Sequence, residues 1–152
     1  MNPATALIAY NAAQRAGFTG AALLIATAIA GAESSFDPNA KGDVNLQTDK
    51  WGPSVGLWQI RSLKNPSIYP YPDNLRDASK LTDPDYNAKA AYAISKQGTD
   101  FSPWSTFVNN AYQSWLNIVE QITSLQQTAA GPLTAIEIFL LLIIGYKIFF
   151  RK

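Results

Sequence analysis

The chain contains neither cysteine nor histidine among its 152 residues. Without cysteine it can form no disulfide, no thiolate nucleophile and no zinc–thiolate site. Without histidine, Ser–His and Cys–His catalysis and the usual catalytic zinc sites are excluded as well. Any enzymatic chemistry must therefore rest on carboxylates, hydroxyls and lysines, and we expect no metal and no organic cofactor.

Charge is also scarce, since 15% of the residues are charged and the formal net charge is +1. Nucleic-acid binding needs a clustered basic face, so the composition does not predict a nucleic-acid partner. Apolar residues, in contrast, make up 47% of the chain, which is enough for one hydrophobic core at this length.

The spacing of apolar residues and the positions of proline and glycine predict a mainly helical chain. Helices are expected over residues 2–16, from 19 or 20 to 33, over 85–96, and over 103–127 as one helix or two in series. Loops are expected over residues 34–55 and 65–77, with a short β element within residues 34–60.

The second predicted helix is apolar almost throughout residues 21–32. Such a helix is buried in a core or a membrane, and a dozen residues are too few to span a bilayer. A signal peptide is the alternative, because Arg15 precedes the apolar run and residues 30–32 (AGA) resemble a cleavage site. Two glycines interrupt the region and its start is weakly charged, so we favour a buried core helix.

The C-terminal residues 133–150 form a second apolar run, interrupted by Thr134, Glu137 and Lys147. About 18 helical residues reach roughly 27 Å, close to the thickness of a bilayer core, and charged side chains near the ends can reach the interface. We predict a membrane-anchor helix in residues 132–152 after a folded domain in residues 1–131. A hydrophobic helix docked on a partner protein is the alternative.

Two glutamates precede this tail, Glu33 and Glu120. Glu120 lies on a polar helix face, where we expect it to be solvated. Glu33 ends the most apolar helix, where desolvation and the negative end of the helix dipole both raise the pKa of a carboxyl group. A raised pKa suits a general acid, although a glutamate that simply turns out to solvent is the alternative.

Four motifs follow one another in the chain: residues 30–38 (AGAESSFDP), 56–60 (GLWQI), 85–92 (DYNAKAAY) and 101–112 (FSPWSTFVNNAY). In this order they resemble the motifs of the lytic transglycosylase and goose-type lysozyme superfamily. The residues of these motifs are most similar to those of lysozyme-like (SLT) domains of phage particles. The resemblance implies a mainly α, lysozyme-like fold with minimal β structure that cleaves the glycan strands of peptidoglycan.

Carried over by position, the resemblance makes Glu33 the catalytic acid/base. It implies that Gln59 hydrogen-bonds the substrate, that Tyr112 steadies Glu33 or the sugar, and that Ser34 fixes the helix end. Tyr92, from the third motif, is expected at the substrate.

Three departures from the family pattern change the expected site. Trp58 replaces the more usual methionine, which predicts a differently shaped subsite wall. The loop after Glu33 is long and leaves the family's cleft serine unplaced, with Ser54 as a candidate. The last motif reads Ala-Tyr-Gln instead of Ala-Tyr-Asn at Tyr112, so its backbone is expected to differ.

Aromatic side chains can stack on sugar rings, and they can equally fill a core. We expect Trp104, which follows a proline at a helix start, to pack in the core. Tyr69 and Tyr71, in a proline-rich loop, are predicted at the cleft rim, and Trp51 is a further stacking candidate.

The chemistry leaves hydrolysis and transglycosylation both open. In substrate-assisted cleavage one glutamate suffices, because the N-acetyl group of the substrate attacks its own anomeric carbon. If water attacks instead, Asp43 and Asp49 in the long loop are candidates to orient it, with solvated loop residues as the alternative.

The expected partners are peptidoglycan strands, a lipid membrane contacted through residues 133–150, and other virion or envelope proteins. With no convincing secretion signal, the phage-like wording favours a virion-associated enzyme on an internal membrane. A bacterial secretion or conjugation transglycosylase on the inner membrane, facing the periplasm, is one alternative. A structural virion protein without turnover is another.

Overall fold

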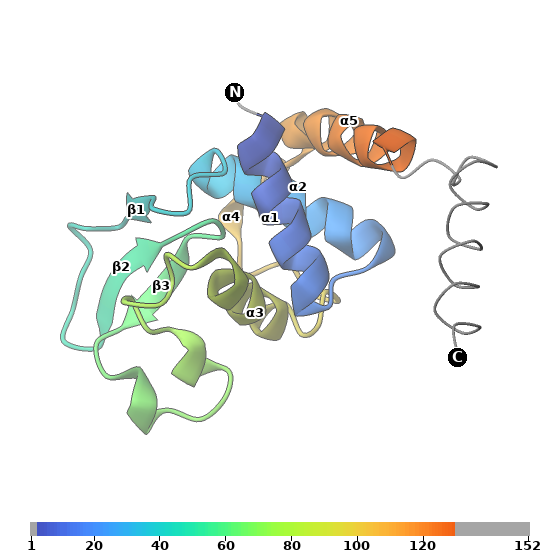
Figure 1. The fold of residues 1–152 in the computed structure, drawn as a ribbon. Helices are drawn as coiled ribbons and strands as arrows, with labels where there is room; N and C mark the ends of the chain where they lie inside the picture. Colours follow the sequence, from blue (N-terminus) through green and yellow to red (C-terminus); the bar gives the residue numbers. More distant parts are fainter. Residues whose placement is uncertain (1–2, 130–152) are drawn as a thin grey trace, which may run out of the picture. The chain divides into compact units, whose positions relative to one another are not determined.

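The computed structural model describes residues 3–129, and its first compact unit spans Met1–Ile122 (Figure 1). The helices are α1 (Pro3–Ala16), α2 (Gly20–Ser34), α3 (Pro84–Ile94), α4 (Ser105–Val108) and α5 (Gln113–Ala129). The strands are β1 (Lys41–Gly42), β2 (Trp51–Val55) and β3 (Ile60–Leu63), and two 3₁₀ turns lie at Pro66–Ile68 and Asp73–Leu75. A mainly helical fold with minimal β structure is thereby confirmed.

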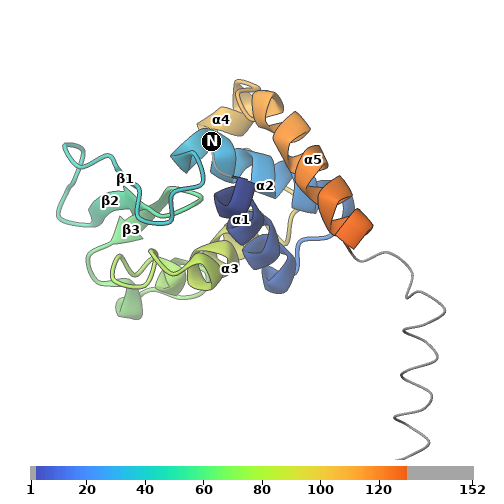
Figure 2. The ribbon, with the colours of Figure 1, turned by 45° about the horizontal axis from the view of Figure 1, so that its top comes forward.

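Helix α2 is the centre of the core, with buried residues along most of its length, from Leu23 to Gly31. Its one buried hydroxyl, that of Thr27, donates to the Leu23 carbonyl at 2.8 Å, so the helix carries no unsatisfied polar group there. Alanines of α1 pack into the same core, and Figures 1 and 2 show α1, α2 and α3 side by side. The burial fits the predicted core helix rather than a cleaved leader.

Within the described residues, no helix is both long and apolar enough to cross a membrane. The predicted membrane helix over residues 133–150 and the predicted boundary after residue 131 lie outside the described part of the chain.

The sheet is a small antiparallel one in the order β1-β2-β3, projecting to one side of the helices (Figure 2). Val55 pairs with Ile60 and Ser54 with Arg61, and the register shifts between Trp51 and Ser54. The predicted β element is confirmed, but β3 continues to Leu63, beyond the expected limit at residue 60. The strands are short, and β2 carries glycine and proline, so the sequence pattern predicts a loop for most of this region.

The turn between β2 and β3 depends on a buried asparagine of α3. The Asn87 side chain accepts from the Trp58 amide at 2.9 Å and donates to the carbonyls of Val55 at 2.9 Å and Leu81 at 2.8 Å. Gly56 has φ +82°, and a Cβ there would lie 2.2 Å from the Leu81 carbonyl oxygen. Only glycine fits this close approach, which brings the turn against α3.

Helices α3, α4 and α5 begin and end at recognisable signals. Asp83 caps α3 by accepting from the Tyr86 amide at 2.8 Å. Helix α3 ends at Ile94, two residues before the predicted end at Lys96, which has φ +50°. The predicted C-terminal helical stretch is two helices in series, because Asn110, with φ +64°, lies in the break between α4 and α5.

Candidate active site

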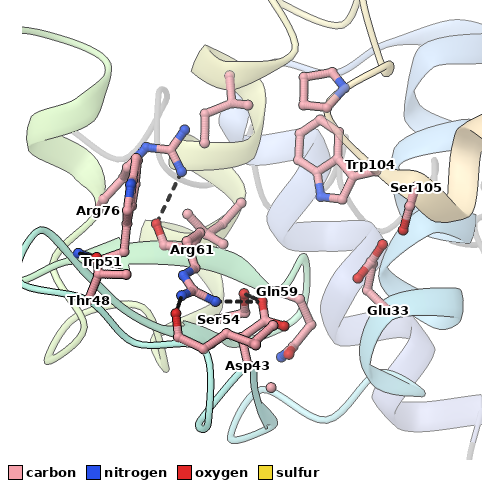
Figure 3. Close-up of a pocket in the computed structure, with 15 residues that line it drawn as sticks. Glu33, Asp43, Thr48, Trp51, Ser54, Gln59, Arg61, Arg76, Trp104 and Ser105 are labelled. Carbon is pink, nitrogen blue, oxygen red and sulfur yellow. Dashed lines mark hydrogen bonds and ion pairs between the residues drawn. The ribbon is translucent and has the colours of Figure 1, made fainter.

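A pocket of about 710 Å³ opens between the C-terminal end of α2, the sheet, and the segment leading into α4 (Figure 3). Glu33 lines it from α2, and Pro103, Trp104 and Ser105 line it beside α4. The sheet side contributes polar and charged groups, namely Asp43, Thr48, Ser54, Gln59, Arg61 and Arg76, together with Trp51.

Glu33 lies in the last turn of α2, partly withdrawn from solvent. Burial raises the pKa of its carboxyl above the ordinary 4.5, and the negative charge of Asp43 raises it further. Hydrogen bonds from Thr106, including one from its hydroxyl to Glu33 Oε1 at 2.6 Å, lower the pKa but do not outweigh the burial. The surroundings of Glu33 therefore favour the protonated form of its carboxyl at the pocket wall.

A second carboxylate, Asp43, lines the same pocket from the loop after β1. Its Oδ2 accepts from the Ser54 hydroxyl at 2.5 Å and lies 3.0 Å from Arg61 Nη1. The hydrogen bond from Ser54 is the main cause that lowers the pKa of Asp43, and Arg61 adds to it. Arg61 also donates to the Leu46 carbonyl, so one guanidinium holds both the carboxylate and its loop. The pocket thus contains one carboxyl with a raised pKa and one with a lowered pKa, the pattern of a divided acid/base pair.

Gln59 lines the pocket at the turn between β2 and β3, with φ +44°. Its Nε2 donates to the carbonyls of Ala40 at 3.1 Å and Gly56 at 2.9 Å. A Cβ at Gly42 would lie 2.5 Å from Gln59 Oε1. The side-chain amide of Gln59 therefore links the loop before β1 to the turn, and its oxygen lies against Gly42 of β1.

A family model described as "Lysozyme like domain" matches residues 10–106, which include Glu33, the sheet and the start of α4. The chain belongs to the lysozyme-like domain family. The match supports a peptidoglycan-cleaving enzyme in general terms and agrees with the resemblance drawn from the four motifs. No curated protein and no solved structure gives a significant match.

Trp58 is placed differently from the expectation. In this lysozyme-like domain its side chain is 1% exposed and its indole donates to the Ala26 carbonyl of α2 at 2.8 Å. Trp58 is a core residue and does not line the pocket, which corrects the prediction of a subsite wall. Trp104 packs in the core as predicted, donating to the Trp58 carbonyl at 2.8 Å, and one face of it also lines the pocket.

The two motif tyrosines also lie away from the pocket lining. Tyr92 packs edge-on against Phe18, with ring centroids 5.0 Å apart, and Tyr112 stacks on Phe107 at 5.1 Å. The side-chain hydrogen bond to Glu33 comes from Thr106 instead of Tyr112. Neither tyrosine lines this pocket, and the roles expected for Tyr92 at the substrate and for Tyr112 in steadying Glu33 or the sugar stay predictions.

Ser34 and Ser54 keep polar contacts within the protein. The Ser34 hydroxyl donates to the Ala30 carbonyl at 2.9 Å, as expected of a residue that fixes the helix end, and Ser34 is not among the residues that line the pocket. Ser54 does line it, with its hydroxyl committed to Asp43.

Of the further candidates, Trp51 lines the pocket, whereas Tyr69, Tyr71 and Asp49 do not. Thr106, Arg61 and Arg76 could not be predicted from the sequence, since an arginine in a short strand, an arginine after a turn and a threonine at a helix start carry no specific signal. Among the described residues no group of His, Cys, Asp or Glu side chains is arranged to hold a metal ion.

Proposed function

We propose that this protein cleaves the β-1,4 bond between N-acetylmuramic acid and N-acetylglucosamine in peptidoglycan, with Glu33 as the acid/base. The observation that carries the proposal is the placement of Glu33 in the pocket, with a pKa raised by burial and a geometry held by Thr106. A general acid must be protonated before it can donate to the leaving oxygen, and the raised pKa meets this need.

The reaction proceeds in two proton transfers. Protonated Glu33 donates to the glycosidic oxygen as the bond to the anomeric carbon breaks, while the substrate's N-acetyl oxygen attacks that carbon. The Glu33 carboxylate then takes the proton of the sugar's C6 hydroxyl. The C6 oxygen attacks the anomeric carbon, breaks its bond to the N-acetyl oxygen and closes a 1,6-anhydro ring, while the N-acetyl group stays on the sugar. Glu33 is protonated again at the end, and no water is consumed.

A muramidase is the second candidate, and Asp43 is the observation that favours it. Asp43 lines the same pocket, its lowered pKa favours the ionised form, and its negative charge raises the pKa of Glu33. An ionised carboxylate at this place can accept a hydrogen bond from an attacking water, which then gives a plain reducing end. Asp49 lies outside the pocket lining and is not needed for this role.

The test is digestion of purified peptidoglycan by the full chain, with mass spectrometry of the released muropeptides. Release of 1,6-anhydro sugars that is lost in Glu33→Gln supports the transglycosylase. Reducing ends that are lost in both Glu33→Gln and Asp43→Asn support the muramidase. No release by the folded protein from several peptidoglycan types would refute both.

We further propose that the enzyme is anchored to a membrane through residues 133–150 and acts from a phage particle as the genome enters the host. The support is the apolar run of the tail and the phage-like wording of the motifs. Purified particles should contain the protein, and alkaline carbonate should not extract it from their membrane. Its absence from particles, with activity in uninfected envelopes, would favour a bacterial secretion or conjugation transglycosylase.

A further inference from the structure

A lysine amine with no ion-pair partner among the described residues lies next to Trp51, at the sheet end of the pocket, although Lys50 itself does not line the pocket. Lys50, an exposed residue just before β2, has no carboxylate of the described chain within 4.0 Å of its Nζ. The two arginines that line the pocket are paired, Arg61 with Asp43 at 3.0 Å and Arg76 with Asp73 at 2.7 Å. Lys50 therefore adds an uncompensated positive charge at this end.

Two aromatic rings hold the Lys50 amine in place. Its Nζ lies 5.0 Å from the ring centroid of Trp51 and 5.0 Å from that of Tyr69, both within the range of a cation–π contact. Trp51 lines the pocket and also lies 5.5 Å from the Arg76 guanidinium. Figure 3 shows Trp51 and Arg76 together on the side of the pocket away from Glu33. These contacts place the amine over two rings, one of which lines the pocket.

The glycan backbone of peptidoglycan is uncharged along its sugars, and its negative charges are carboxylates of the stem peptide that the muramyl sugar carries. An amine that no carboxylate pairs attracts a carboxylate through its full charge, whereas a neutral sugar offers it hydrogen bonds without that attraction. Resting on the proposed function, we propose that Lys50, held over Trp51 and Tyr69, binds a carboxylate of the stem peptide. The enzyme then selects glycan strands that still carry charged stems.

The test separates binding from cleavage. Full-length Glu33→Gln protein is sedimented at low salt with insoluble peptidoglycan, either native or with its carboxylates converted to methylamides by carbodiimide and methylamine. Lys50→Gln is then added to this background. Lys89→Gln is the matched control, because Lys89 is an exposed lysine on α3 whose chain neighbours, unlike Trp51 beside Lys50, do not line the pocket, and its loss changes the net charge equally.

We expect tighter binding to native than to methylamidated peptidoglycan. Lys50→Gln should lower that ratio roughly two- to fivefold, the effect of one exposed ion pair, and Lys89→Gln should preserve it. Equal binding to both materials, or the same ratio in both lysine variants, overturns the proposal and leaves sugar stacking on Trp51 as the role of this end.

Cleavage by the unsubstituted protein is measured in parallel, so the two proposals fail separately. Cleavage without charge preference retains the proposed function and refutes the role of Lys50. Charge-dependent binding through Lys50 without any cleavage refutes the proposed function and retains the role of Lys50.

Discussion

Glu33 is the residue to which we assign the acid/base role, and the groups around it can be sorted by whether they raise or lower the pKa of its carboxyl. Burial and Asp43 raise its pKa, whereas Thr106 lowers it. The chain has no histidine and no cysteine, the side chains that commonly titrate near neutrality. Glu33, whose pKa is raised by burial, is therefore the group in this pocket that best suits a proton donor.

Glu33 should make the folded protein less stable as the pH rises. Its folded-state pKa lies above the ordinary 4.5, so its stabilising contribution is complete below pH 4.5 and is lost as the pH rises through the folded-state value. Chemical denaturation of the full chain across this range should show the decline, and Glu33→Gln should remove it. A variant that declines as steeply as the unsubstituted protein would contradict the assignment.

In the digestion assay Glu33→Gln should lower activity by about 100- to 10,000-fold.

Two substitutions around Glu33 should move the pH profile in opposite directions. Thr106→Val removes a hydrogen bond that lowers the pKa of Glu33, so the alkaline limb of the activity profile should shift to higher pH. Asp43→Asn removes a negative charge that raises this pKa, so the same limb should shift to lower pH. Thr106→Ser, which keeps the hydroxyl, should restore the original profile. Shifts of equal sign would show that one of the two groups does not act on Glu33 as described.

At the scale of elements, helix α3 positions the sheet wall of the pocket through one side chain. Asn87 is fully buried and hydrogen-bonds three backbone groups, those of Val55 and Trp58 at the turn and that of Leu81 before α3. This turn contains Gln59, so the pocket wall depends on a residue that does not touch the pocket itself.

Asn87→Ala should leave three buried backbone groups without partners. Each unsatisfied group costs about 1–3 kcal/mol, so unfolding should require at least about 3 kcal/mol less free energy. Denaturation of the full chain measures this loss, and Asn39→Ala, at an exposed loop position, is the control. A loss below about 1 kcal/mol would indicate that water replaces the amide at these three points.

The helices could be predicted from the sequence to within a residue or two, because their ends carry local signals such as Asp83-Pro84 before α3. The sheet could be predicted only as a short β element. Its strands carry Gly52 and Pro53, and what holds them is the contact with Asn87, 29 residues from Trp58 in the chain. Local patterns contain no information on such a contact.

The same distinction holds in the site. Glu33 could be predicted because a carboxylate at the end of an apolar helix is unusual. Its partner Thr106 could not, since it lies 73 residues away and reads as an ordinary helix-start residue. Trp58 was expected to line a subsite because it lies in the motif of residues 56–60, yet its side chain is 1% exposed and packs in the core.

On the scale of the whole domain, the pocket lies where three parts of the chain far apart in sequence meet. The helical core supplies Glu33, the sheet supplies Asp43 and Gln59, and the segment before α4 supplies Trp104. Indole hydrogen bonds join these parts, from Trp104 to the Trp58 carbonyl and from Trp58 to the Ala26 carbonyl. The two sides of the pocket are therefore tied together through the core.

The positions of the tryptophans also make intrinsic fluorescence a measure of whether the pocket is occupied. Of the four in the chain, Trp51 and Trp104 line the pocket, Trp58 is sealed in the core, and Trp115 packs on Phe36. Glycan binding to Glu33→Gln should shift the intrinsic emission to shorter wavelength as Trp51 loses water. Trp51→Phe should abolish most of the shift and Trp115→Phe should keep it, so occupancy of the pocket can be followed by light without any attached label.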